Sequence, residues 1–253
     1  MNRPIRIGLI AEGRTELGFS VPDMKPEDGG KIISRENEGA LHTLIRRELK
    51  DAGLPDCDFV QRHPSMKESN NNQRRTGHGI LDPKYLAQIV IAWKPEEVDL
   101  IVIVADTDDQ LIQRQNELKL SLKIIQNNHL DIDENIIEDQ STGGLAVKNF
   151  ETWLLADTQT ISRILDMEIP RLEDLEDSSK TKKILEKAIN ESNYMSQENN
   201  RNLRIHQIKW NLAVQIDLMI LKKTCPQGYG TFAQELIAIA QRFSRKEINF
   251  FGD

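Results

Sequence analysis

Residues 98–106 read VDLIVIVAD and contain the longest unbroken apolar run of the sequence, LIVIVA at 100–105. A run that is apolar on both faces is typical of a strand in a parallel sheet, which helices cover on both sides. IRIGLIA at 5–11 has the same character. Both runs are far shorter than the about 20 apolar residues that a membrane-spanning helix needs. The sequence therefore predicts two buried strands and no membrane partner.

Short strands and helices alternate along the first part of the chain. Further strands are predicted at 57–61 and at 144–147, the latter entered through Gly143 and Gly144. Apolar residues at helical spacing predict helices at 38–52, 83–93, 110–128, 151–157, 158–165, 179–190, 201–222 and 232–243. This order predicts an α/β fold with a Rossmann-like, mostly parallel sheet flanked by helices. We expect a core at 1–157 and a helical C-terminal extension at 158–253 packed on it.

Composition limits the classes of protein that need to be considered. The chain is 38% hydrophobic and 29% charged, with a formal net charge of −7. The negative charge argues against a protein that coats nucleic acid, so a local basic patch or metal ions would have to hold such a partner. Cys57 and Cys225 form neither a disulfide framework nor a zinc motif. With no recognisable signal peptide at 1–11, we expect a cytoplasmic protein.

Carboxylates follow both of the clearest strands. Glu12 comes directly after the first strand and Asp106 ends the strand at 98–106, so both should lie at the carboxyl edge of the sheet. Glu16 lies four residues after Glu12 in EGRTE, with Gly13 allowing a tight turn and Thr15 expected to cap a helix. Asp108 and Asp109 follow Asp106, and Asp108 faces the same way if the chain stays extended. A cluster of this kind repels itself unless a cation lies within it.

Magnesium suits this set of oxygen ligands better than zinc, because no His or Cys is near in the sequence. Three other interpretations stay open. DTDDQ at 106–110 could simply cap the N-terminus of the following helix and have no other role. EGRTE at 12–16, at the end of another strand, makes this interpretation less attractive. DTDDQ could also supply the aspartate nucleophile of a phosphatase, which leaves EGRTE unexplained. A calcium loop is disfavoured because the glycine and distant glutamate of an EF-hand are missing.

Three motifs in order resemble a known family. An apolar strand ending in EGxTE, then one ending in DxD, resembles the TOPRIM domain of topoisomerases, primases and overcoming-lysis-defect (OLD) nucleases. AVKNFETWLLAD at 146–157 is similar to the FExWLLAD signature of an uncharacterised bacterial TOPRIM-like family, and TCPQGYGTF at 224–232 to its C-terminal segment. The resemblance covers residues 5–157 by its core motifs and implies a TOPRIM-like fold.

The resemblance also implies roles for individual residues. Glu12 would be a metal ligand or general base with Glu16 assisting, and Asp106 and Asp108 would be metal ligands. Lys148 matches, by its place after the fourth strand, a lysine that neutralises charge in the transition state. Glu151 could add a carboxylate beside the metal ions, whereas Asp157 is expected to cap the next helix.

The function implied is hydrolysis of phosphodiester bonds in DNA or RNA with one or two Mg²⁺ or Mn²⁺ ions, in bacterial antiviral defence. A topoisomerase or primase would need parts that 253 residues do not supply. OLD nucleases carry an ATPase, but GxxxxGK[ST] is absent, so an ATPase would be a separate partner. A homo-oligomer is compatible with this function. Two alternatives remain: a regulatory or binding module that docks on an ATPase without cutting, and a small-molecule phosphoesterase.

Nucleic acid could be held by the polar segment around NNNQRR at 70–75. The basic residues proposed to contact phosphates are Arg62, Lys67, Arg74 and Arg75. A solvated surface loop explains this segment equally well. RNLRIHQIKW at 201–210 is interpreted as an amphipathic helix that packs on the core with its charges in water, and His206 as a surface or boundary residue.

Overall fold

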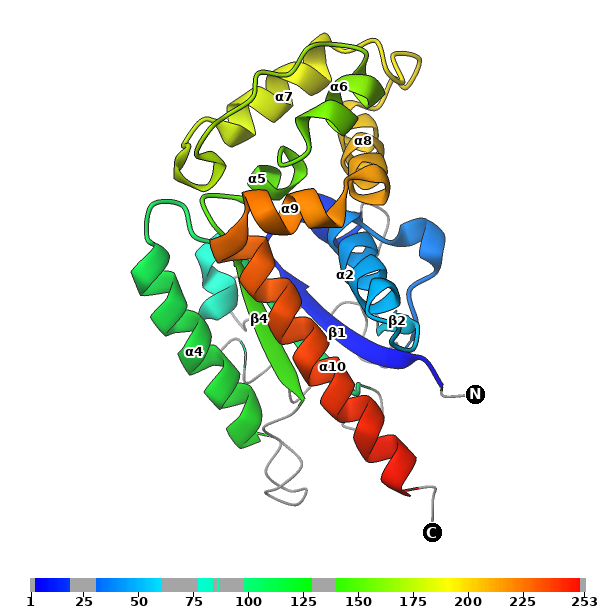
Figure 1. The fold of residues 1–253 in the computed structure, drawn as a ribbon, viewed down its shortest axis with the longest axis vertical. Helices are drawn as coiled ribbons and strands as arrows, with labels where there is room; N and C mark the ends of the chain where they lie inside the picture. Colours follow the sequence, from blue (N-terminus) through cyan, green and yellow to red (C-terminus); the bar gives the residue numbers. More distant parts are fainter. Residues whose placement is uncertain are drawn as a thin grey trace, which may run out of the picture.

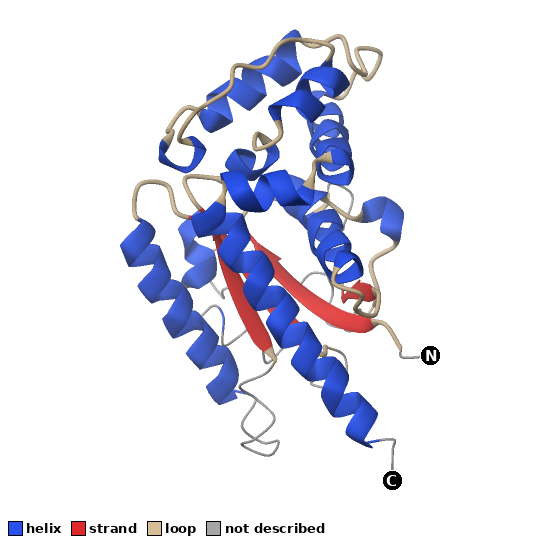
Figure 2. Cartoon of the chain, in the orientation of Figure 1, coloured by secondary structure: helices blue, strands red, loops and turns tan. Residues whose placement is uncertain are grey.

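A four-stranded, all-parallel sheet lies at the centre of the chain, with helices around it (Figures 1 and 2). The computed structural model describes residues 3–18, 31–60, 77–83, 86, 98–128 and 140–250. The strands are β1 (Ile5–Ala11), β2 (Cys57–Val60), β3 (Leu100–Asp106) and β4 (Ser141–Ala146), in the order β2-β1-β3-β4. The predicted α/β fold with a parallel sheet is confirmed.

Strand register sets the edge at which the predicted site residues emerge. Ala11 of β1 lies opposite Val104 of β3, and Asp106 of β3 lies opposite Ala146 of β4. Because the strands are parallel, the residues after β1, β3 and β4 leave the sheet at the same edge. This is the carboxyl edge, where ligands bind in open α/β sheets.

Helices account for most of the remaining described residues. Their bounds are α1 (Arg14–Leu17), η2 (Arg35–Asn37), α2 (Ala40–Asp51), η3 (Gly77–Leu81), α4 (Leu111–Asn128), α5 (Phe150–Leu154), α6 (Thr158–Leu165), η5 (Leu175–Asp177), α7 (Thr181–Glu191), α8 (Arg201–Gln215), α9 (Leu218–Thr224), η6 (Pro226–Gly230, a turn of π-helix) and α10 (Thr231–Phe250). Within the described part of the chain, every helix is too short or too polar to span a membrane. The helix predicted at 83–93 lies almost entirely outside the described residues.

Alternate side chains of the strands enter two apolar clusters, one on each face of the sheet. One face packs with α2, α5 and α10, and the other with η3 and α4. Two adjacent glycines in β4 serve the two faces in turn. A Cβ atom on Gly143 would lie 2.7 Å from Leu118 of α4, and one on Gly144 would lie 2.6 Å from the Phe232 ring of α10. The glycines are therefore inside the strand and let both helices approach. The strand predicted at 144–147 exists, but it begins earlier, at Ser141, and ends at Ala146.

The single helix predicted at 201–222 is two helices, α8 and α9. The chain is extended at Ile216 (ψ 139°), and the Asp217 side chain accepts hydrogen bonds from the backbone N–H groups of Met219 and Ile220. The Asp217 N–H itself donates to Asp157 Oδ2 at 3.1 Å. Asp217 is thus an N-cap that begins a new helix. Apolar spacing alone did not reveal it, because both helices contribute to the same core.

The segment TCPQGYGTF packs inside the molecule. Tyr229 is fully buried and its hydroxyl donates to Glu48 Oε1 of α2 at 2.9 Å, while Lys222 Nζ lies 2.6 Å from Glu48 Oε2. The Tyr229 ring meets the indole of Trp153 edge-on, and the Phe232 ring stacks on the same indole with a centroid distance of 5.6 Å. Trp153 is a core residue. This segment therefore joins α2, α5 and α10.

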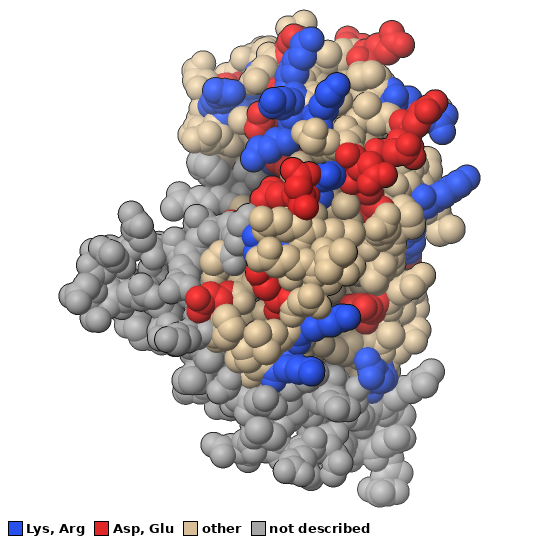
Figure 3. Space-filling model, turned by 90° about the vertical axis from the view of Figure 1, so that its left-hand side faces the viewer, with Lys and Arg blue, Asp and Glu red and all other residues tan. Residues whose placement is uncertain are grey.

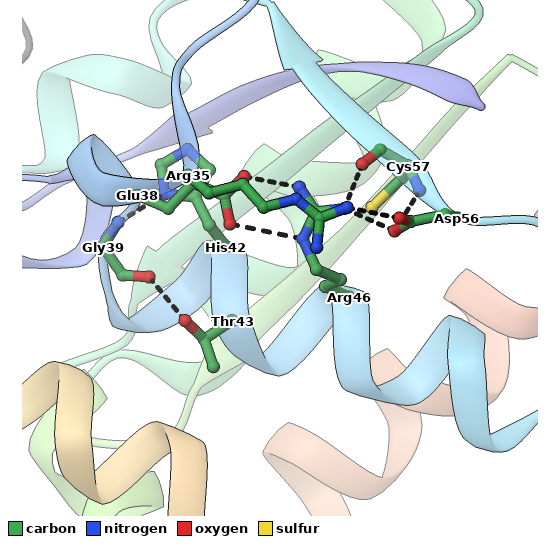
Figure 4. A network of polar contacts seen from close by, with 8 residues as sticks. All are labelled: Arg35, Glu38, Gly39, His42, Thr43, Arg46, Asp56 and Cys57. Carbon is green, nitrogen blue, oxygen red and sulfur yellow. Dashed lines mark hydrogen bonds and ion pairs between the residues drawn. The ribbon is translucent and has the colours of Figure 1, made fainter.

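Arg46 of α2 ties the edge strand β2 to the rest of the fold (Figure 4). Its guanidinium lies 2.5 Å from Glu38 Oε1 and also contacts the Asp56 carboxylate and the Cys57 carbonyl. The same side chain lies over the Phe59 ring of β2. A single partly buried arginine thus connects the chain before α2 with the start of β2.

Candidate functional site

Glu12 and Asp106 meet at the carboxyl edge of the sheet. Glu12 Oε1 accepts a hydrogen bond from the Asp106 backbone N–H at 3.1 Å, across the boundary between β1 and β3. The two residues are 94 positions apart in the sequence, and the register of the parallel strands brings them together. Their position at one sheet edge is as the sequence predicted.

Glu16 belongs to the same region through the short helix α1. Its side chain is 7% exposed, and its Oε2 atom accepts a hydrogen bond from the Gly13 N–H at 3.0 Å. A Cβ atom on residue 13 would lie 2.3 Å from Glu16 Oε1, so a larger residue there would displace the carboxylate from this position. Thr15 was expected to cap this helix but lies inside it, because Gly13 is the N-cap.

The pKa values show that these carboxylates act on one another. Burial, together with the charges of Glu16 and Asp108, raises the pKa of Glu12 to about 7, against the opposing effect of the Asp106 N–H and of Arg114. Burial also raises the pKa of Asp106 well above its usual value, and the charges of Glu16, Glu12, Glu151 and Asp108 add to this. The structure therefore brings the other four predicted carboxylates within electrostatic reach of Asp106.

Glu151, at the start of α5, is paired with a lysine that the sequence analysis placed in water. Lys209 Nζ of α8 lies 2.6 Å from Glu151 Oε1, and both side chains are less than a tenth exposed. Although burial opposes it, Lys209 holds the pKa of Glu151 below its usual value, with Lys182 contributing. The prediction that the charges of RNLRIHQIKW lie in water was therefore wrong for Lys209, whereas Glu151 is among the carboxylates as expected.

Lys209 and Lys182 also act on Glu16. Burial raises the pKa of Glu16 and the charge of Glu151 raises it further, whereas the Gly13 N–H, Lys209 and Lys182 lower it. Glu12, Glu16, Asp106, Asp108 and Glu151 are called the carboxylate cluster below. The helical C-terminal segment therefore supplies positive charge to this cluster.

Asp108 and Lys148 face each other across a short antiparallel bridge beyond the ends of β3 and β4. The Asp108 N–H donates to the Lys148 carbonyl at 2.9 Å, and the Lys148 N–H donates to Thr107 Oγ1 at 2.8 Å. Both residues have left-handed backbones, with φ of 48° and 66°. The chain is therefore not extended at Asp108, which is exposed. Sparsely populated φ values in non-glycine residues are concentrated at functional sites.

Lys148 does not contact the cluster through its ammonium group in this structure. Its Nζ atom lies 2.6 Å from Asp109 Oδ1, where the Asp109 side chain is 79% exposed. The resemblance gave Lys148 the role of neutralising negative charge. In this structure Lys209 and Lys182 supply positive charge to the cluster instead. Asp157 caps α6 as predicted, since its Oδ1 accepts a hydrogen bond from the Thr160 N–H at 3.1 Å.

The cluster fits a hard cation by its chemistry. All five side chains end in carboxylate oxygens, the ligands that Mg²⁺ and Mn²⁺ prefer. Burial and mutual repulsion raise the pKa values of Glu12, Glu16 and Asp106, and a bound cation would relieve the repulsion. In the part of the chain that the structure describes, however, no three His, Cys, Asp or Glu side chains are already arranged as a ligand set. Holding an ion would therefore require side chains of the cluster to rearrange.

The residues predicted to contact nucleic acid, Arg62, Lys67, Arg74 and Arg75, lie outside the described residues. A different basic group is exposed on the C-terminal lobe, where Lys180, Lys182, Lys183 and Lys187 lie on and just before α7. Figure 3 shows Lys and Arg side chains gathered on the upper part of one face, with Asp and Glu side chains beside them.

Sequence reasoning missed the lysines because their partners are far away in the chain. One signal was present for Lys209: it lies four residues after Ile205 and three and four before Leu212 and Ala213, so it is on the side of α8 that packs inward. A charged residue at such a position requires a buried partner.

No family model, curated protein or solved structure matches this chain.

Proposed function

We propose that this chain is a metal-dependent nuclease of the TOPRIM-like kind, which hydrolyses phosphodiester bonds with one or two Mg²⁺ or Mn²⁺ ions. The observation that carries the proposal is the set of carboxylates that raise one another's pKa at the carboxyl edge of a parallel sheet. Such a cluster costs the protein stability, so its presence indicates a function. Binding a divalent cation is the simplest such function.

Glu12, Glu16, Asp106 and Asp108 would hold the metal. A bound Mg²⁺ would polarise the scissile phosphate and make water nucleophilic at neutral pH. Lys209 holds the Glu151 carboxylate in place and, with Lys182, balances negative charge next to Glu16. Lys148 is the partner of Asp108 in the bridge, and its ammonium group could turn from Asp109 to a phosphate.

Two features support the finer TOPRIM-like assignment. The EGxTE and DxD motifs end adjacent parallel strands, and the FETWLL segment follows the next strand and places Glu151 among the carboxylates. A cytoplasmic nuclease of antiviral defence, acting with a separate ATPase, is the context that we propose from the family resemblance. The nucleic-acid contacts at Arg62, Lys67, Arg74 and Arg75 belong to the same proposal.

A cleavage assay tests the proposal. Supercoiled DNA, single-stranded DNA and tRNA would each be incubated with Mg²⁺, Mn²⁺ or EDTA. We expect metal-dependent cutting that is lost in Asp106→Ala and Glu12→Ala and kept in the matched control Glu173→Gln, because Glu173 is exposed and remote in sequence from the cluster. Equal cutting by wild type and both Ala variants would overturn the site assignment, and the substrate cut identifies DNA or RNA as the target.

A second candidate is a regulatory module that keeps the cluster for docking on an ATPase. Two observations favour it: the described residues contain no ready-made ligand set, and Glu151 is already neutralised by Lys209. In the assay above it predicts no cleavage of any nucleic acid under any metal condition. Release of phosphate from small esters without strand cleavage would instead indicate a phosphoesterase.

A further inference from the structure

A small pocket of about 260 Å³ lies between α8 and the segment around η2. Leu203, His206, Gln207 and Trp210 line it from α8, at positions that fall on one side of the helix. Arg35 to Glu38 line it from the other side. The volume is below that of most pockets for drug-sized ligands, so the pocket suits a single ring system.

The pocket combines an aromatic surface with an unsatisfied polar atom. Trp210 is 40% exposed, which is unusual for the largest aromatic side chain. Gln207 Oε1 is buried and accepts no hydrogen bond from any described residue. Buried acceptors in proteins are nearly always hydrogen-bonded, and a ligand with an N–H donor would supply the partner that Gln207 Oε1 lacks among the described residues.

Several other polar groups around the pocket are already paired with neighbouring residues. Glu38 faces away toward Arg46, with its Oε1 atom 2.5 Å from the guanidinium, as Figure 4 shows. Asn37 Nδ2 donates to Ser34 Oγ at 2.7 Å, and Arg35 pairs with Asp56 at 2.5 Å. Glu36 and Glu38 add negative charge on this side, which disfavours a phosphate within the pocket. A neutral aromatic ring is the ligand that remains.

The pocket approaches the carboxylate cluster through its Glu38 wall. Lys209, two residues after Gln207, is on the opposite side of α8, where it pairs with Glu151. On the other wall, Gly39 follows Glu38 and packs against the backbone of α1, since a Cβ atom on Gly39 would lie 2.2 Å from the Glu16 carbonyl oxygen. A chain that lies across the cluster could therefore place a neighbouring group in the pocket.

We propose that this pocket takes one unpaired nucleobase of a single-stranded nucleic acid, stacked on Trp210 with a base N–H donating to Gln207 Oε1. The inference rests on the proposed function, because the base belongs to a strand whose phosphate reaches the carboxylates. Stacking on an aromatic side chain is how proteins hold single strands, and a base inside a duplex is not available for it. The pocket makes the chain selective for single-stranded or locally opened substrates.

Binding in EDTA tests the pocket without any cleavage. Fluorescein-labelled 12-nucleotide single strands, an otherwise identical abasic strand and a 12-base-pair duplex would be titrated by anisotropy. We expect Trp210→Ala to weaken single-strand binding about tenfold, Trp210→Phe to restore most of it, and Gln207→Leu to weaken it less. Duplex and abasic binding should not change, and neither should the salt dependence, because no phosphate contact is removed.

Met219→Ala is the matched control, because Met219 is another apolar side chain of the same lobe and is 72% exposed. It should bind all three probes as wild type does. The pocket is ruled out if Trp210→Ala and Gln207→Leu bind single strands like wild type, or if they weaken duplex and abasic binding equally. Wild-type protein that binds no single strand also overturns it.

The two proposals fail in different ways. Cleavage that depends on Asp106, with normal binding by Trp210→Ala, removes the pocket and keeps the nuclease. Single-strand binding that depends on Trp210, without cleavage under any metal condition, removes the nuclease and keeps the base site.

Discussion

At the scale of the residue, the carboxylate cluster is a source of instability when no metal is bound. The raised pKa of Asp106 means that folding favours its protonated form. Its contribution to stability is complete below the unfolded pKa, near 3.8, and is lost as the pH rises through the folded value. Metal-free protein should therefore become less stable between acid and neutral pH because of this site.

Asp106→Asn should stabilise the metal-free protein at pH 8. The amide carries no charge to be repelled by Glu12 and Glu16, so we expect a gain of about 1.4 kcal/mol for each unit by which the pKa was raised. At pH 4 the gain should nearly vanish. Urea denaturation in EDTA at both pH values measures it, with exposed Asp174→Asn as the control. An equal effect at both pH values would show that repulsion is not the cause.

Lys209→Met should be strongly destabilising. It leaves the Glu151 charge buried without its partner, which costs about 3–5 kcal/mol for comparable pairs. The double variant Glu151→Gln with Lys209→Met should recover most of the loss, because the uncompensated charge is gone. Denaturant midpoints of the four proteins in this cycle give the coupling. A double variant no more stable than Lys209→Met alone would contradict it.

Sequence reasoning reached Glu12 and Asp106 because each directly follows an apolar strand, and parallel strands place such residues at one edge. It could not reach the pairing of Lys209 with Glu151. That contact joins two helices 58 positions apart, and helical spacing shows which side of α8 packs inward but not what lies opposite.

At the scale of the element, capping decides where the C-terminal helices begin and end. The predicted helix types were correct across most of this region, but the boundary between α8 and α9 was missed. Asp217 lies at helical spacing inside an apparently continuous pattern, so only its hydrogen bonds to Met219 and Ile220 reveal the break.

Asp217→Ala should cost about 1 kcal/mol of stability. The variant removes the side-chain acceptor for the first N–H groups of α9. Asp217→Asn should retain most of the wild-type stability, because asparagine is also a good N-cap. Exposed Glu186→Ala on α7 is the control, and thermal unfolding followed by circular dichroism is the measurement. If Ala and Asn were equally stable, the cap would not matter here.

At the scale of the whole molecule, α10 covers β4 and packs against α2, although it follows them by long stretches of chain. Figure 1 shows it crossing the sheet. The proposed division into 1–157 and 158–253 stays a prediction, but residues on both sides of it share one apolar cluster. The parallel sheet was predictable from the strand patterns. Which helix covers each face of the sheet was not predictable, because apolar spacing shows which side of a helix is buried but not which element it packs against.

Leu236→Ala in α10 should destabilise the whole protein by about 2–5 kcal/mol. Leu236 is fully buried in the cluster that contains β1 and β3, so its loss leaves a cavity in the common core. Gln234→Ala, on the exposed side of the same helix, should have little effect. Urea titrations should show one transition for both variants. A separate, early transition of α10 alone would mean that the helix is not part of that core.

The position of α10 in the chain also affects how the protein is made. β4 ends at Ala146 and α10 begins only at Thr231, so the ribosome synthesises the entire intervening helical segment before the helix that covers β4 exists. Until then, the apolar face that receives Phe232 is open to water and to other growing chains. We therefore expect the nascent chain to be most prone to aggregation during this interval.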